Sequence, residues 1–292
     1  MHGIAYFELS WSILSSIGLF TALLAIWAVL ITRPSPLSYV PIVVSVACAA
    51  ANGLCYFSYY TSHSLVHRIA GSAFADIFWL IQEAGLSFYS YQILTHTLHN
   101  SARTSFLLIF WSLMLLILGL RLAILVSRIL DLQTPSNTKP STLNQHRISY
   151  LHVGYFVSIA LVESWSSFFL IRLLNSARDL SPKVSSTREV FRYLLRTTEI
   201  RVASLAAVGV TRAITYSWQV TAQSAVSVQG EVDRFVYCGE CLFPLVLIVD
   251  ILASKKYSPV AASEPRSPLQ RAGHVRVPTS DSWPLRREWE SP

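Results

Sequence analysis

The sequence predicts an all-α membrane protein, a bundle of seven transmembrane helices. Only 13% of its 292 residues are charged and the mean hydropathy is +0.45, whereas soluble domains carry about 25% charged residues. Seven apolar runs also reach the roughly 20 residues that a helix needs to cross a bilayer. They lie near residues 10–32, 38–60, 70–94, 104–127, 150–172, 198–219 and 233–252.

The distribution of basic residues predicts the orientation of the bundle. Lysine and arginine gather at the ends of the runs on one side, as at Arg172, Arg178 and Lys183, and outnumber those on the other side by two to one. Because basic residues accumulate on the cytosolic side, we expect a lumenal amino terminus and a cytosolic carboxyl terminus. The first run does not resemble a signal peptide, since Glu8 precedes it and no basic region does. No sorting signal points away from the endoplasmic reticulum, so we expect that membrane.

Two parts are expected along the chain: a membrane domain over residues 1–253 and a basic tail over residues 254–292. The tail holds six of the thirteen prolines, and seven basic residues against four acidic ones. We expect it to be disordered, because this composition cannot bury enough apolar surface to fold. The net charge of +7 partly reflects this tail, so it does not indicate nucleic-acid binding.

The third apolar run carries the polar residues around which we expect the bundle to be organised. At about 100° per residue they fall on one face of a helix. Carboxyl groups on a membrane helix are expensive to bury, so they normally face a bundle interior or a wet cavity and are functional candidates. The alternative is that each acid pairs with an arginine and only locks helices together. The face comprises Ser72, Asp76, Trp79, Glu83, Ser87 and Ser90.

Acids outnumber bases among the ionisable groups that the sequence places inside the spans. Four acids face two arginines, so at least one carboxyl group is left without a cationic partner. Burial disfavours the charged form of such a group, so we expect it to stay protonated at neutral pH and to be able to act as a general acid. A polar pocket open toward the lumenal side is the simplest arrangement. The acids are Asp76, Glu83, Glu163 and Glu240, and the arginines are Arg121 and Arg212.

Several other kinds of site are not indicated. The first 138 residues contain no lysine, and Lys255 and Lys256 lie at the cytosolic end of the seventh run, so retinal binding is not expected. The DRY and NPxxY signatures of the large receptor class, aspartate-rich magnesium motifs, the P-loop and the Rossmann glycine pattern are absent. Two histidine pairs, His63 with His67 and His96 with His99, flank the third run at opposite ends. A helix of that length holds the two pairs too far apart to share one metal site. We therefore expect neither a metal ion nor another cofactor.

The third and sixth runs contain the segments FADIFWLIQEAGLSFYSYQIL (residues 74–94) and YLLRTTEIRVASLAAVGVTRAITYSWQ (residues 193–219). Through these segments the chain resembles the fungal integral-membrane terpene cyclases of meroterpenoid pathways, of the ascochlorin and ascofuranone type. The resemblance extends over the third to the seventh run. The residues beyond 254 have no counterpart in the shorter cyclases of this kind.

The resemblance implies an enzyme without a metal or redox cofactor that acts on a hydrophobic prenylated small molecule within the lipid bilayer. A protonated carboxyl group would open an epoxide on the prenyl chain, rings would close through carbocations, and a base would then remove a proton. Asp76 and Glu83 are the first choices for the proton donor, followed by Glu163 and Glu240.

Three aromatic residues, Trp79, Tyr216 and Tyr237, lie on the faces that carry the ionisable groups. The family resemblance implies carbocations that the faces of aromatic rings would stabilise, which makes all three candidates for substrate binding. The same resemblance implies that Arg121 and Arg212 would orient the acids or hold the polar head of the substrate. The alternative for the aromatic residues is packing, because such side chains line many membrane bundles.

A seven-span receptor-like or transport-associated protein is the alternative. In a receptor the basic third cytosolic loop and the tail would bind a protein partner, whereas a cyclase needs neither. The sequence itself identifies no protein partner.

Overall fold

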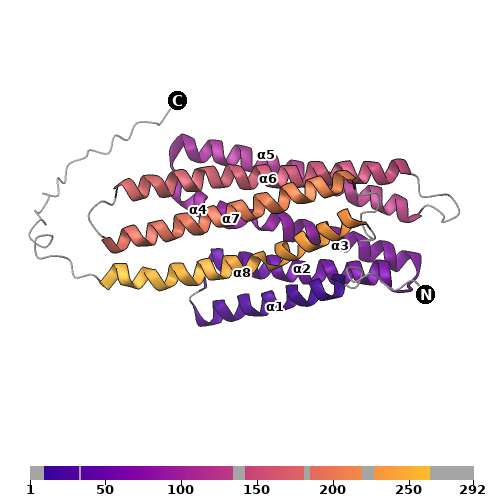
Figure 1. Ribbon diagram of the computed structural model, residues 1–292, viewed down its shortest axis with the longest axis horizontal. Helices are drawn as coiled ribbons and strands as arrows, with labels where there is room; N and C mark the ends of the chain where they lie inside the picture. The colour runs from indigo at the N-terminus through magenta and orange to yellow at the C-terminus, as the bar shows by residue number, and fades with distance from the viewer. Residues whose placement is uncertain (1–9, 33, 134–141, 181–184, 219–226, 264–292) are drawn as a thin grey trace, which may run out of the picture.

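The computed structural model describes residues 10–32, 34–133, 142–180, 185–218 and 227–263, and this part of the chain consists of eight helices without strands. The helices lie side by side along the long axis of the molecule (Figure 1). They are α1 (Ser10–Ile31), α2 (Pro36–Tyr60), α3 (Leu65–Gly85), α4 (Ser87–Thr97), α5 (Asn100–Gln133), α6 (Thr142–Leu180), α7 (Ser185–Trp218) and α8 (Val228–Ser263).

The helices form a closed ring in chain order. α1 packs against α2, α2 against α3, and α3 against α5. The ring continues through α6 and α7 to α8, which packs against α1 and closes it. The short helix α4 also contacts α2 and α6. α3 and α4 therefore act as one interrupted rod with neighbours on several sides, which gives the polar face of this segment many partners.

Five helices are long and apolar enough to cross a membrane by length and composition: α1, α2, α5, the part of α6 from Gln145 to Leu173, and the part of α8 from Val228 to Ala253. This agrees with the predicted helical membrane protein. α8 continues to Ser263, past the domain boundary expected at residue 253. The rest of the expected tail, residues 264–292, lies outside the described residues.

The third and sixth runs are where the structure differs from the seven spans expected. The third run is divided at Leu86 into α3 and α4. Gly85 ends α3, and glycine weakens a helix by about 0.5–1 kcal/mol relative to alanine. A Cβ on Gly85 would lie 3.0 Å from Val44 of α2, so α2 packs closely against the interruption. The sixth run belongs to the longer helix α7, whose buried Arg201 and Arg212 make it less apolar than the other spans.

Apolar side chains cover much of the outside of the ring, while charged side chains lie within it. Leu30, Leu115 and Phe235 are 77%, 66% and 73% exposed, yet many of the acids and arginines are almost fully buried. A soluble protein shows the opposite distribution, because its charged residues are rarely buried. An environment of lipid accounts for both observations.

Small residues let α1 and α2 approach each other closely. A Cβ on Gly18 of α1 would lie 2.5 Å from the backbone nitrogen of Ala49 in α2. Backbones can come this near only where a glycine leaves room. The contact places Trp11 of α1 at 2% exposure in a cluster with Trp79 and Tyr237, so α1 forms one wall of the polar interior.

Candidate functional site

The polar face expected on the third run does point into the bundle. None of its six residues is more than 6% exposed. The face continues across the interruption at Leu86, because Ser87 and Ser90 of α4 are buried like Asp76 and Glu83 of α3. The helical periodicity of the sequence is thus confirmed, and the acids lie where other helices supply their partners.

Two arginines of α5 hold Asp76. Arg128 Nη1 lies 2.7 Å from Asp76 Oδ1, and Arg121 Nη2 lies 3.2 Å from the same oxygen. The Nε–H of Arg121 also donates to the backbone carbonyl oxygen of Asp76 at 3.0 Å. These contacts tie α3 to α5, and they correspond to the structural alternative for this acid.

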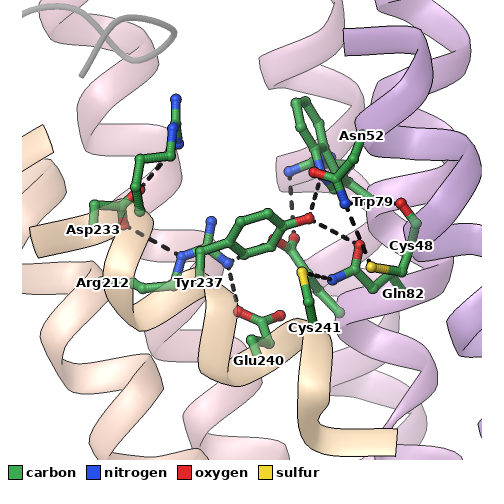
Figure 2. Close-up of polar contacts among 12 residues, drawn as sticks. Cys48, Asn52, Trp79, Gln82, Arg212, Asp233, Tyr237, Glu240 and Cys241 are labelled. Atoms are coloured by element: carbon green, nitrogen blue, oxygen red, sulfur yellow. Dashed lines mark hydrogen bonds and ion pairs between the residues drawn. The ribbon is translucent and has the colours of Figure 1, made fainter. Parts of the chain in front are cut away.

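Arg212 of α7 is shared by three carboxylates. Its Nη1 lies 2.8 Å from Glu83 Oε1 and 2.7 Å from Glu240 Oε2, and its Nε lies 3.4 Å from Asp233 Oδ1. Figure 2 shows Arg212 between Asp233 and Glu240 of α8. Asp233 also lies 3.4 Å from Arg234 Nη1. One guanidinium therefore joins α3, α7 and α8.

Aromatic rings enclose these ion pairs. The guanidinium carbon of Arg212 lies 4.0 Å from the ring centre of Phe156 and 4.7 Å from that of Tyr237, and that of Arg121 lies 5.4 Å from Trp79. The Trp79 indole N–H donates to the Tyr237 hydroxyl at 2.8 Å, and that hydroxyl donates to Gln82 Oε1 at 3.0 Å, as Figure 2 shows. In this arrangement the rings already face arginines, so the faces of Phe156, Tyr237 and Trp79 are occupied by protein cations.

The ring of Tyr216 stacks on the ring of His152. Their rings are parallel within 5° and their centres are 4.6 Å apart. The Ser149 hydroxyl donates to the backbone carbonyl oxygen of Tyr216. This stack connects α6 to the end of α7 beside the ion pairs.

The hollow among these residues is about the size of one water molecule. Its volume is about 10 Å³, at the lower limit for holding a water. It is lined by six of the nine candidate site residues, Trp79, Glu83, Arg121, Arg212, Tyr216 and Tyr237, together with Trp11, Arg128, His152 and Arg234. The structure brings the predicted residues together but leaves no space for a substrate between them.

Charge in this cluster balances. Four acids, Asp76, Glu83, Asp233 and Glu240, meet four arginines, Arg121, Arg128, Arg212 and Arg234. A separate pair, Arg201 and Asp250, joins α7 to α8 at 3.6 Å. The buried acids of the described residues therefore exceed the buried arginines by one.

The remaining acid is Glu163 of α6. It is 5% exposed, and its Oε1 lies 2.5 Å from the Ser87 hydroxyl of α4. Among the described residues it is the buried acid that forms no ion pair with an arginine. It lines a small cavity of about 20 Å³ together with Glu83, Glu240, Phe156 and Gly209. The predicted surplus of acid is thus present, but at Glu163 and not at Asp76 or Glu83.

Five further charged residues are buried that were not among the ionisable groups expected inside the spans: Arg128, Arg201, Asp233, Arg234 and Asp250. Arg128 lies seven residues after Arg121, on the same face of α5, so its spacing could have identified it. Asp233 and Arg234 are near the start of α8, a position typical of groups at the membrane surface. Only the packing of α8 against α1 and α7 buries them.

Comparison of the chain with protein-family models, curated proteins and solved structures gave no match. Among the described residues, no three histidine, cysteine, aspartate or glutamate side chains are arranged to hold a metal ion.

Proposed function

We propose that the chain is a membrane-bound terpene cyclase that protonates the epoxidised prenyl chain of a meroterpenoid and closes its rings through carbocations. Glu163 is the proton donor in this proposal. One observation carries the proposal. Every other buried acid of the described residues has an arginine within 4 Å, and Glu163 does not.

The charge balance supports a neutral Glu163. An ionised carboxylate in a low-dielectric interior without a cation is costly, and such a group gives up its charge instead. The Ser87 hydroxyl donates to Glu163 Oε1 at 2.5 Å, so the carboxyl proton of a neutral Glu163 would lie on Oε2. Glu163 would therefore hold a transferable proton, whereas Asp76, Glu83 and Glu240 each lie within 4 Å of an arginine.

The proposed reaction conserves every atom. The Glu163 O–H proton moves to the epoxide oxygen while a carbon–oxygen bond of the epoxide breaks, and an alkene of the chain attacks the carbon that becomes positive. The last carbocation loses a proton to a base, for which Glu240 on the same small cavity is the candidate. The proton then returns to Glu163, and the product is an isomer of the substrate.

Substrate binding must widen the cavity, since about 20 Å³ is far below the 300–1,000 Å³ typical of ligand pockets. Small residues favour such widening between α6 and α7. A Cβ on Gly209 of α7 would lie 3.4 Å from Ala160 of α6, so no large side chain fills this part of the contact. Movement of α7 away from α6 would bring Glu163 and Phe156 to the substrate.

The proposal includes seven spans in the endoplasmic reticulum membrane, with a lumenal amino terminus and a cytosolic carboxyl terminus. The ring of contacts supports it, because α3 with α4 and α7 pack between the five apolar helices. Glycosylation acceptor sites added before Ser10 and after Ser263 test it. Modification before Ser10 alone agrees with the proposal, whereas modification at both ends, or only after Ser263, contradicts it.

The activity is tested with microsomes that contain the full chain and an epoxy-farnesyl phenol. We expect a cyclised product of unchanged mass. Glu163→Gln should lower the rate about 100-fold or more, the range expected for loss of a general acid. The matched control is Glu231→Gln, the same change at an exposed position of α8, which should leave the rate unchanged.

Two further variants separate the proton donor from the structural acids. Asp76→Asn and Glu83→Gln should lower the amount of folded protein, because each breaks an ion pair, while the folded fraction keeps measurable activity. A fully active Glu163→Gln variant would refute the assignment of the donor. An inactive wild-type chain that inserts normally would refute the cyclase proposal.

A further inference from the structure

A large apolar groove lies along the α3–α4 junction, and Glu163 is not among the residues that line it. Its volume is about 490 Å³, within the range of sites that hold drug-sized ligands. α2 and α5 form its walls, and the small residues Ala84 and Gly85 lie at the junction that lines it. Residues on both sides of the interruption at Leu86 line the groove.

The groove changes in character along its length. α2 begins at Pro36 and α4 follows α3, so the start of α2 and the middle of α4 lie toward the same end of the antiparallel bundle. At this end the lining includes Tyr39, Gln92 and Trp111, which can form hydrogen bonds. Farther along, where Val43, Leu115 and similar residues line it, the groove is entirely hydrocarbon.

The lining also restricts the occupant by its charge. None of the described residues that line the groove is lysine, arginine, histidine, aspartate or glutamate. A phosphate or diphosphate head normally requires cations or backbone donors at its site, so this groove does not suit a phospholipid head or a prenyl diphosphate. It suits an uncharged amphiphile with a hydroxyl or carbonyl group at one end.

We propose that this groove binds the prenyl chain of an uncharged prenylated aromatic compound, with the aromatic head at Gln92 and the chain along Val43 and Leu115. The identity of the occupant as substrate rests on the proposed cyclase function. The position of the groove is consistent with delivery to Glu163, because Ser87 contacts Glu163 while the next residue, Phe88, lines the groove. A rearrangement at Leu86, between α3 and α4, would connect the groove to Glu163.

A photoreactive farnesyl phenol with a diazirine near the end of its chain tests the site without requiring turnover. The probe is added to the full chain in lipid nanodiscs, and labelled peptides are identified by mass spectrometry. We expect labelling on the parts of α2 and α5 that contain Val43 and Leu115. Val43→Trp should reduce labelling about tenfold, which corresponds to about 1.4 kcal/mol of binding free energy.

Val46→Trp is the matched control. Val43 and Val46 both lie on α2 and are 52% and 48% exposed, but only Val43 lines the groove. Equal effects of the two variants, or labelling spread evenly over the exposed leucines of α1 and α5, would overturn the inference. So would competition by phosphatidylcholine as strong as that by unlabelled farnesyl phenol, since the groove would then be a site for lipid acyl chains.

The outcomes also distinguish the groove from the cyclase. Glu163→Gln should be labelled like the wild type, because the acid does not line the groove. Site-specific labelling of a chain that converts no substrate would contradict the proposed function and leave the groove as a binding site. Conversion that persists in Val43→Trp would contradict the groove and leave the function.

Discussion

The structure predicts a large loss of stability when Arg212 is replaced. Arg212→Met keeps a long side chain but removes the guanidinium that three carboxylates share. Asp233 retains Arg234 at 3.4 Å and Glu83 retains Arg121 at 3.6 Å. Glu240 retains no arginine among the described residues. The main cost of the substitution is therefore one orphaned carboxylate at Glu240.

Breaking a buried ion pair by removing one partner costs about 3–5 kcal/mol. We expect Arg212→Met to lower the free energy of unfolding by about this amount in a denaturation titration with SDS in mixed micelles. Adding Glu240→Gln to Arg212→Met removes the orphaned charge, so the double variant should be more stable than the single one. Such non-additivity is what a double-mutant cycle measures for residues in contact.

Arg103→Met is the control, because Arg103 lies on α5 with an exposed side chain, and its effect should stay within about 0.5 kcal/mol. If Arg212→Met costs no more than Arg103→Met, the arginine is not the centre of the charge cluster. If the double variant is less stable than Arg212→Met, the assignment of the cost to Glu240 is refuted.

Four other substitutions, in two matched pairs, test the helix packing and a buried hydrogen bond by the same titration. Gly18→Ala should destabilise the protein by about 1–3 kcal/mol, because the new Cβ would lie 2.5 Å from the backbone of α2. Gly119→Ala should instead stabilise the protein by up to about 1 kcal/mol, because no atom lies within 4 Å of the new Cβ. If Gly18→Ala and Gly119→Ala changed the stability in the same direction, the described approach of α1 to α2 would be contradicted. Tyr237→Phe should cost about 1–3 kcal/mol by removing the donor to Gln82, and Tyr150→Phe, at a 71% exposed position, should cost almost nothing.

The interior face of the third run could be predicted because helical geometry is local. A residue's direction on a helix follows from its number alone, so Asp76 and Glu83 had to share a face wherever the helix lay. The length and apolarity of α1, α2, α5, α6 and α8 are likewise properties of single segments. The interruption at Leu86 was harder to foresee, because Gly85 is compatible with either a continuous or a broken helix.

The ion-pair partners of the buried acids could not be predicted in this way, because they depend on which helices meet. Counting acids and arginines predicted a surplus of acid, but it could not say which acid would be left over. The α3–α5 contact gives Asp76 two arginines, and the meeting of α3, α7 and α8 gives Glu83 and Glu240 a share of Arg212. Glu163 faces α4, which offers a hydroxyl group in place of a guanidinium.

The sequence by itself determined that this chain forms apolar helices with acids on their inner faces, since both properties are set by the order of residues along one segment. Only the tertiary structure decided which carboxyl group has no arginine within 4 Å, because that depends on the distance to cations from helices far apart in the chain. The same holds for the groove, whose walls come from α2 and α5 and whose lining the interruption in α3 completes.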